Sequence, residues 1–225
     1  MAVIQDKDKE NIKKELDEGL EGDVKLIMFT QENECQFCAD TRVMVEELAG
    51  MSPKIEAEIH DFVKDEKMAK SYKVKKIPAI VMLGEKDYGI RFYGIPSGYE
   101  FKSFQEDLVD VSRGSTDLST EVKKKLATIK KPVHIQVLVT STCPYCSMAV
   151  RTAHKLAIEN EHIRADMVEM VEMVEFPHLV QKYMAMSVPK IVINEIVDFV
   201  GAQPPEHFVE EIIRALRASD NPMYS

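Results

Sequence analysis

The chain of 225 residues has no tryptophan, only four cysteines and no apolar run close to the ~20 residues that a membrane-spanning helix needs. The missing apolar run argues against a membrane partner. Residues 1–6 lead directly into charged sequence without the apolar stretch of a signal peptide, so we expect a cytoplasmic protein. In a reducing compartment, paired cysteines are more often catalytic or metal-binding than structural.

Positive charge is outnumbered by negative charge, because 29 Lys and Arg residues face 38 Asp and Glu residues and the net charge is −9. This balance argues against nucleic acid as a partner. The abundant Lys and Glu and the missing tryptophan are typical of a thermophile, in which intracellular disulfides do occur. With 45% hydrophobic residues, the chain can bury the core of one large domain or of two ordinary ones.

All four cysteines lie in two short motifs, Cys35-Gln36-Phe37-Cys38 and Cys143-Pro144-Tyr145-Cys146. Each motif follows an apolar, partly β-branched run, 24–29 or 133–139, and leads into a helical pattern. The helical spacing places Cys143 at an exposed helix N-terminus and turns Cys146 toward the core. A helix N-terminus lowers the pKa of a thiol, and the second sulfur can reach the first to form a disulfide. A C-x-x-C motif between a strand and a helix indicates redox chemistry.

The same order of elements occurs twice, on either side of the polar segment 113–117. In the first half, the patterns predict helices over 6–20, from the cysteine pair to about 49, over 64–72 and 100–111, and strands over 24–29, 54–62, 79–83 and 88–93. In the second half, they predict helices over 119–129, 143–160, 176–184 and 206–216, and strands over 133–139, 163–171, 190–193 and 196–200. Cys35 and Cys143 are 108 positions apart, and Pro78 and Pro189 are 111 apart. We therefore predict a duplicated domain, with units over 1–116 and 117–225.

A second recurring feature is the pair of dipeptides Ile77-Pro78 and Val188-Pro189, each at the start of a predicted hairpin. A proline placed there is a candidate for a cis peptide bond. The alternative is a trans proline that begins an edge strand, and the pattern by itself favours it.

The succession strand, C-x-x-C helix, strand, helix, X-Pro, hairpin and closing helix resembles the thioredoxin-like order, and Cys143-Pro144-Tyr145-Cys146 resembles the glutaredoxin active site. Two such units in tandem resemble the glutaredoxin-like protein disulfide oxidoreductases of thermophilic archaea and bacteria. The resemblance implies an α/β fold of two tandem thioredoxin-like units, each a central mixed β-sheet flanked by helices. It also implies that Pro78 and Pro189 are cis and that the backbones of Ile77 and Val188 bind the substrate chain.

The resemblance further implies that Cys143 attacks a substrate disulfide, that Cys146 resolves the mixed disulfide, and that Cys35 and Cys38 do the same in the first unit. Phe37, Pro144 and Tyr145 would then contact substrate beside the sulfurs. Two departures from the pattern stand out. Thioredoxins carry a buried carboxylate in the strand before the motif, and neither 26–29 nor 137–139 has one. Glutaredoxins hold glutathione with a Gly-Gly and an Asp, where this chain has Gly201-Ala202-Gln203-Pro204.

Three functions fit the motifs. The first is an enzyme that reduces, forms and isomerises disulfides in protein substrates, with redox-active disulfides and no other cofactor, recharged by a thioredoxin-reductase-like flavoprotein. The second is a dedicated electron shuttle from a flavoprotein to a peroxiredoxin, which resembles the N-terminal part of flavin-dependent alkyl hydroperoxide reductases. The third is a zinc protein, but zinc ribbons separate their pairs by about 15–20 residues, far less than the distance from Cys38 to Cys143.

The two motifs differ in local charge. Glu32, Glu34 and Asp40 surround Cys35, whereas the sequence from 135 to 158 contains no carboxylate. A nearby carboxylate disfavours a thiolate. We therefore predict that Cys143 is the more acidic thiol and that the second site carries most of the reductase activity.

Overall fold

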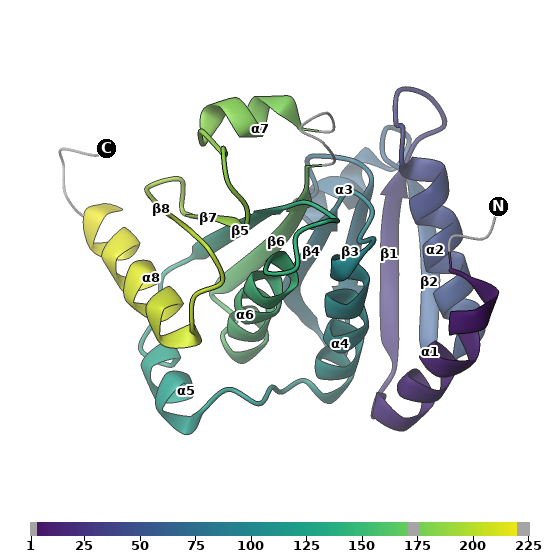
Figure 1. Ribbon diagram of the computed structural model, residues 1–225, viewed down its shortest axis with the longest axis horizontal. Helices are drawn as coiled ribbons and strands as arrows, with labels where there is room; N and C mark the ends of the chain where they lie inside the picture. Colours follow the sequence, from purple (N-terminus) through teal and green to yellow (C-terminus); the bar gives the residue numbers. More distant parts are fainter. Residues whose placement is uncertain (1–3, 171–175, 220–225) are drawn as a thin grey trace.

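One mixed sheet of eight strands, in the order β2-β1-β3-β4-β6-β5-β7-β8, runs through the computed structural model, which describes residues 4–170 and 176–219 (Figure 1). The first half consists of α1 (Asp6–Gly19), β1 (Val24–Thr30), α2 (Cys38–Met51), β2 (Ile55–Asp61), α3 (Glu66–Ser71), β3 (Ala79–Leu83), β4 (Asp87–Tyr93) and α4 (Tyr99–Arg113). The second half consists of α5 (Thr120–Leu126), β5 (Val133–Val139), α6 (Cys146–Glu159), β6 (Ile163–Glu169), α7 (Pro177–Lys182), β7 (Lys190–Ile193), β8 (Val197–Val200) and α8 (Pro205–Ser219).

The two halves repeat one strand arrangement. The central strand β1 pairs in parallel with β2 and antiparallel with β3, and β3 pairs antiparallel with β4. In the second half, β5, β6, β7 and β8 pair in the same way. This is the predicted pair of thioredoxin-like halves. The predicted strands 79–83, 133–139 and 190–193 are confirmed residue for residue.

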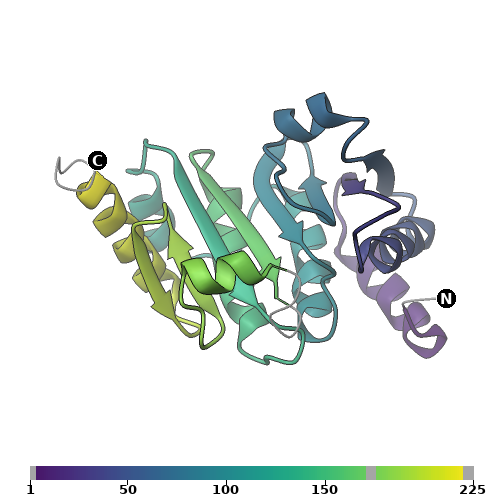
Figure 2. The same cartoon turned by 90° about the horizontal axis from the view of Figure 1, so that it is seen from above.

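The halves are joined by a parallel pairing of β4 with β6, from Ile90 opposite Ala165 to Tyr93 opposite Val168. Two sheets that could have stood apart thus form one, and Figures 1 and 2 show the halves side by side. Each of these strands would otherwise be an exposed sheet edge with unpaired backbone groups. The pairing explains why Phe92 and Tyr93, near the end of β4, are fully buried.

Each face of the sheet has its own apolar core, because successive strand residues point to opposite sides. Leu26 and Met28 of β1 face a core shared with α1, α2, α4, α5, α6 and α8. Ile27 and Phe29 face the opposite core, which α3 and α7 cover. The strand predicted to about Val171 is described to Glu169, and Val171 lies outside the described residues.

A buried polar cluster fixes α4 of the first half against α6 of the second. Arg151 pairs with Asp107 and Asp110, and at 3.1 Å with Glu106. The other oxygen of Asp107 lies 2.6 Å from Nδ1 of His154, which is fully buried. Buried charges are tolerated when they are paired in this way. The cluster therefore holds the two helices in one register.

The polar segment between the halves is anchored rather than loose. After α4, Gly114 adopts a left-handed conformation, with φ of 65°. Thr116 then donates both its backbone N–H and its hydroxyl to Glu159 at 2.6 Å, and Lys123 pairs with the same carboxylate at 2.8 Å. Among the residues that the structure describes, no helix has the length and apolar character needed to cross a membrane.

Candidate active sites

Both cysteine pairs form disulfides at the ends of the central strands β1 and β5. The Cα atoms are 5.5 Å apart for Cys35 and Cys38 and 5.4 Å apart for Cys143 and Cys146. The first cysteine of each pair is partly exposed, whereas Cys38 and Cys146 are buried. This agrees with the predicted outward and inward directions at the second site. In each pair, one sulfur can meet a substrate while the other stays within the protein.

The predicted helix start at Cys143 is wrong by three residues, because α6 begins at Cys146 and α2 at Cys38. The N–H of Cys143 donates to Thr140 at 3.0 Å and the N–H of Cys146 donates to Cys143 at 3.3 Å, so a turn precedes the helix. The sequence Cys-Pro-Tyr suits such a turn, because proline fixes φ and lacks a donor. Cys143, the predicted attacking cysteine, therefore lies ahead of the first helical turn.

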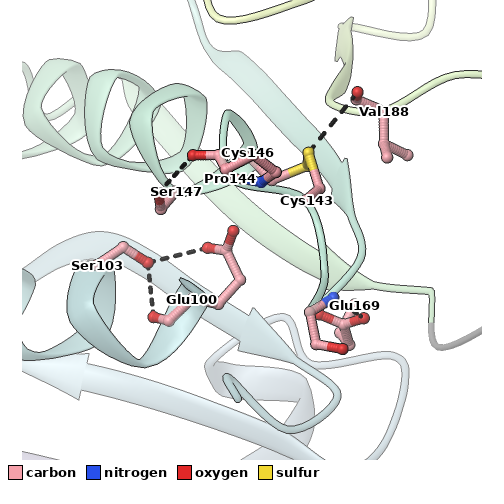
Figure 3. Close-up of a disulfide and its surroundings, with 9 residues drawn as sticks. Glu100, Ser103, Cys143, Pro144, Cys146, Ser147, Glu169 and Val188 are labelled. Carbon is pink, nitrogen blue, oxygen red and sulfur yellow. Dashed lines mark hydrogen bonds between the residues drawn. A yellow bond between two sulfur atoms is a disulfide. The ribbon is translucent and has the colours of Figure 1, made fainter. Parts of the chain in front are cut away.

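Both X-Pro bonds are cis, as the family resemblance implied and as the pattern alone did not favour. Their loops occupy equivalent places, since Pro78 accepts a hydrogen bond from Gly94 at 3.0 Å and Pro189 from Gly201 at 2.9 Å. The carbonyl oxygen of Val188 lies 3.8 Å from the sulfur of Cys143 (Figure 3). The structure thus brings the second proline loop and the second cysteine motif together.

Large apolar side chains are exposed on the segments around the second site. Tyr145 in the motif is 64% exposed, and Met184 and Met186 in the proline loop are 79% and 82% exposed. Met148 on α6 and Tyr99 at the start of α4 are exposed as well. We call these five residues the apolar rim. Only Tyr145 among them could be identified from the sequence, because helix and strand periodicity says little about loop side chains.

A buried carboxylate lies beneath the second site, and it comes from the other half. Glu100, in the first turn of α4, is fully buried, and burial raises its pKa to about 7, with the charge of Asp107 adding to the effect. Its Oε2 accepts a hydrogen bond from Ser103 at 2.9 Å, while Oε1 has no hydrogen-bond partner among the described residues. In Figure 3 the carboxylate points toward the first turn of α6, which carries Cys146.

The start of α4 is placed by close contact with the loop that leads to Cys143. The N–H of Tyr99 donates to the carbonyl of Ser141 at 3.2 Å. At Gly98, which has φ of 59°, an added Cβ would collide with that same carbonyl oxygen. Only glycine combines this backbone conformation with so close an approach. Gly98 therefore sets the position of Glu100 relative to the second motif.

A second buried carboxylate supports the same loop. Glu169, the last residue of β6, accepts a hydrogen bond from the N–H of Ser141 at 3.0 Å. Its counterpart at the end of β2 is Asp61, which is partly exposed and accepts from Val63 and Lys64 at 3.0 and 2.8 Å. The same strand position therefore supports the redox loop in one half and a turn in the other.

Local sequence patterns do not mark Glu100 or Glu169 as site residues. A glutamate in the first turn of a helix is common because it suits the helix dipole. Glu100 lies beneath the second site because α4 of the first half packs against α6 of the second. The charge comparison made from sequence was therefore incomplete, since two carboxylates approach the second site from distant segments. Arg151, the cation nearest to Cys143 in sequence, is paired with acids of α4.

Comparison with known proteins supports this geometry. The thioredoxin domain family matches residues 133–214. A thioredoxin of Methanocaldococcus jannaschii is 38% identical over 84 residues, which cover 37% of this chain and 96% of that protein. The crystal structure of a protein disulfide oxidoreductase from Aeropyrum pernix K1 has 27% identity and a TM-score of 0.87, and covers 95% of this chain and 94% of its own.

A third relative is longer. An alkyl hydroperoxide reductase component of Pseudomonas aeruginosa is 28% identical over 134 residues, which are 60% of this chain but 25% of that protein. The match to the disulfide oxidoreductase, by contrast, covers 95% of this chain and therefore extends over both halves. The chain therefore belongs to the thioredoxin family and is a protein disulfide oxidoreductase built from two tandem thioredoxin-like halves.

Proposed function

We propose that this oxidoreductase reduces, forms and isomerises disulfides in protein substrates, and that the second site carries most of the reduction. The observation that carries the proposal is the partly exposed Cys143 beside the Val188 carbonyl, with Cys146 buried behind it. Cys35 and Cys38 act in the same way at the first site. We also propose that the functional units meet near residues 116 and 117 and that the protein acts in the cytoplasm.

Reduction begins with the thiolate of Cys143, which attacks one sulfur of a substrate disulfide. The substrate S–S bond breaks, a mixed disulfide forms, and the departing substrate sulfur takes up a proton. Cys146 then loses its proton and attacks the sulfur of Cys143. This releases the second substrate thiol and leaves Cys143 and Cys146 joined, so two electrons have passed to the substrate. Oxidation of a substrate dithiol is the same sequence in reverse.

Cys146 needs a proton acceptor, because a buried thiol is a poor nucleophile until it is ionised. Glu100 is our proposed acceptor. Its pKa of about 7 is close to the operating pH, where a general base is most effective. Its carboxylate points toward the helix turn that contains Cys146 (Figure 3). Glu100 would thus fill the role that the strands 26–29 and 137–139 leave without a carboxylate.

The substrate chain would lie along the proline loops. A backbone carbonyl beside the reactive sulfur, as at Val188, can pair with an extended peptide whatever its sequence. Ile77 is the equivalent residue at the first site. Pro144 and Tyr145 at the second motif, and Phe37 at the first, would contact the side chains next to the disulfide. The exposed methionines of the apolar rim suit varied substrates, because methionine adapts its shape.

A second candidate function is electron transfer from a thioredoxin-reductase-like flavoprotein to a peroxiredoxin. The partial similarity to the alkyl hydroperoxide reductase component favours it. In this function the physiological acceptor would be one protein disulfide rather than many. The two functions share the chemistry of Cys143 and Cys146 and differ in the breadth of their substrates.

The test is insulin reduction with dithiothreitol, followed by a panel of flavoprotein reductases and peroxiredoxins. A general oxidoreductase should reduce insulin and several unrelated disulfide proteins at comparable rates. Fast reduction of one peroxiredoxin with negligible insulin turnover would favour the shuttle instead. A protein in which both Cys143 and Cys35 are replaced by serine is the control and should be inactive in every assay.

A further inference from the structure

A cavity of about 790 Å³ lies between the two halves, on the face of the sheet that α3 and α7 cover. Its floor is the junction of β4 and β6, where Arg91, Tyr93, Arg164 and Asp166 line it. One wall comes from the segment 71–76 of the first half and the other from α7 of the second. No cysteine lines the cavity, so it is separate from both redox sites.

The cavity has the opposite charge to the rest of the molecule. Six Lys and Arg side chains line it against four carboxylates, together with three histidines, although the chain as a whole has a net charge of −9. A concave surface of one sign concentrates its electric field on a ligand of the other sign. The volume falls within the range of about 300–1,000 Å³ that is usual for small-molecule sites.

The charges on the floor neutralise one another. Arg91 pairs with both oxygens of Asp87 at 2.9 and 2.6 Å. Arg164 pairs with both oxygens of Asp166 at 2.7 and 2.9 Å and donates to the hydroxyl of Tyr93 at 2.8 Å. These pairs form a rigid, nearly neutral base that joins the halves. The net positive charge must therefore come from the walls.

Three lysines of one wall, Lys73, Lys75 and Lys76, have no salt-bridge partner within residues 4–170 and 176–219. The Nζ of Lys76 lies 4.2 Å from the centre of the Tyr93 ring. Burial lowers the pKa of Lys76, the charge of Asp166 opposes this, and Arg164 and Lys75 add to it. A partly buried ammonium without a counter-ion is costly, and a bound anion would remove that cost.

We propose that this cavity binds a small polyanion with two or more negative charges, of the pyrophosphate class, and that Lys73, Lys75 and Lys76 hold it. The ligand bridges the halves, because the lysines belong to the first and the opposite wall to the second. The same lysines lead directly to the cis bond between Ile77 and Pro78. Occupancy of the cavity therefore constrains the loop of the first redox site, and its opposite wall, α7, leads into the proline loop of the second.

The experiment is calorimetric titration of the oxidised protein with pyrophosphate at low ionic strength, with thermal unfolding as a second readout. Wild-type protein should bind saturably and unfold at a higher temperature as pyrophosphate is added. Lys76→Gln should weaken binding about tenfold, as expected for one charge-assisted contact. Lys67→Gln is the matched control. It removes the same charge as Lys76→Gln, but Lys67 lies on α3 outside the cavity.

Equal weakening by Lys67→Gln would overturn the proposal, since it would reveal only attraction to net charge. Absence of saturable binding in the wild type would also overturn it. Tighter binding of a glutamate-rich peptide than of pyrophosphate, lost in Lys76→Gln, would replace the small ligand with a protein partner. If Lys76→Gln lowers the unfolding temperature without ligand, Lys75→Gln at an exposed position provides the same comparison. Insulin reduction is measured separately, so this result does not depend on the redox function.

Discussion

The two proline loops of this oxidoreductase have similar backbone conformations but expose different side chains. In the first half the loop presents Lys73 and Lys75, and in the second half Met184 and Met186 stand at the same positions. Lys73 and Met184 even share a left-handed backbone, with φ of 57° and 46°. The duplicated fold thus keeps the position of the loop and varies what it offers to a partner.

The two cysteine motifs differ in the same way. The first is surrounded by exposed acids, including Glu32 and Glu34, whereas the second has the exposed aromatic ring of Tyr145. The first motif therefore presents an acidic surface and the second an aromatic one.

The two sites also differ in the buried carboxylates near them. Glu100 and Glu169 are buried beneath the second site. Around the first redox helix, Glu47 instead pairs near the surface, at 3.0 Å with the N–H of Ile4 and at 3.3 Å with Lys9. The difference follows from the fusion, since the pairing of β4 with β6 brings α4 against α6. One half of the molecule therefore places a buried carboxylate beneath the cysteine pair of the other.

The largest expected effect is on the attacking cysteines. Cys143→Ser should lower insulin reduction roughly 100-fold, because it removes the nucleophile of the main site. Cys35→Ser should lower it less than about threefold, as expected if the first site carries a minor share. Steady-state turnover with dithiothreitol measures both. Comparable losses in the two variants would remove the functional difference between the sites.

The next effect separates the roles within the second site. Cys146→Ser should accumulate mixed disulfides with substrate, because the buried sulfur that resolves them is gone. Cys143→Ser should accumulate almost none. A non-reducing gel after incubation with oxidised substrate gives the answer, with Cys38→Ser as the equivalent at the first site. Equal trapping by Cys146→Ser and Cys143→Ser would contradict the assigned roles.

The buried acid should also make stability depend on pH. The pKa of Glu100 is raised from 4.5 to about 7, so the folded protein keeps a proton that the unfolded chain releases in this range. Its contribution to stability is complete below about pH 4.5 and is lost as the pH rises through about 7. The glutamine of Glu100→Gln does not titrate. The unfolding free energy of this variant should therefore rise relative to that of the wild type as the pH increases, by roughly 3 kcal/mol at most.

Urea unfolding of both proteins at pH 4.5, 6 and 8 measures this difference. The other ionisable groups are common to the two proteins and cancel in the comparison. A difference in unfolding free energy that stays constant across the three pH values would show that folding does not raise the pKa of Glu100.

The smallest expected effect concerns the acids around Cys35. Glu34 is exposed, so water screens its charge and the low end of a Coulomb estimate applies, about half a pKa unit at ~6 Å. Glu34→Gln should therefore speed alkylation of Cys35 by roughly threefold near neutral pH. The measurement uses a variant that retains only the first cysteine pair. An unchanged rate would show that buried geometry alone distinguishes the two thiols.

Much of the scaffold could be predicted from local patterns. Apolar runs bounded by turn residues predicted β3, β5 and β7 to the residue, and the repeat predicted two similar halves. The positions of the cysteine helices were less accurate, because a turn absorbed three residues before Cys146. Helical periodicity cannot detect such a turn when its residues also fit the helix pattern.

What could not be predicted arises from contacts between the halves. The pairing of β4 with β6 could not be predicted from the sequence, because the composition of a buried strand does not indicate which strand lies beside it. Glu100, the cluster around Arg151 and the cationic cavity all depend on that pairing. The boundary near residue 116, the thermophilic source and the cytoplasmic location stay predictions.

The most direct test of the account is the pH dependence of the resolving step at the second site. It uses a variant in which Cys35 and Cys38 are serine, with and without Glu100→Gln, and follows release of the second substrate thiol by rapid mixing. We expect a rate that rises with an apparent pKa near 7, and a loss of that inflection with at least about tenfold slowing in Glu100→Gln. An unchanged rate and an unchanged pH profile would show that Cys146 loses its proton without Glu100, and that the second site does not depend on the first half for its chemistry.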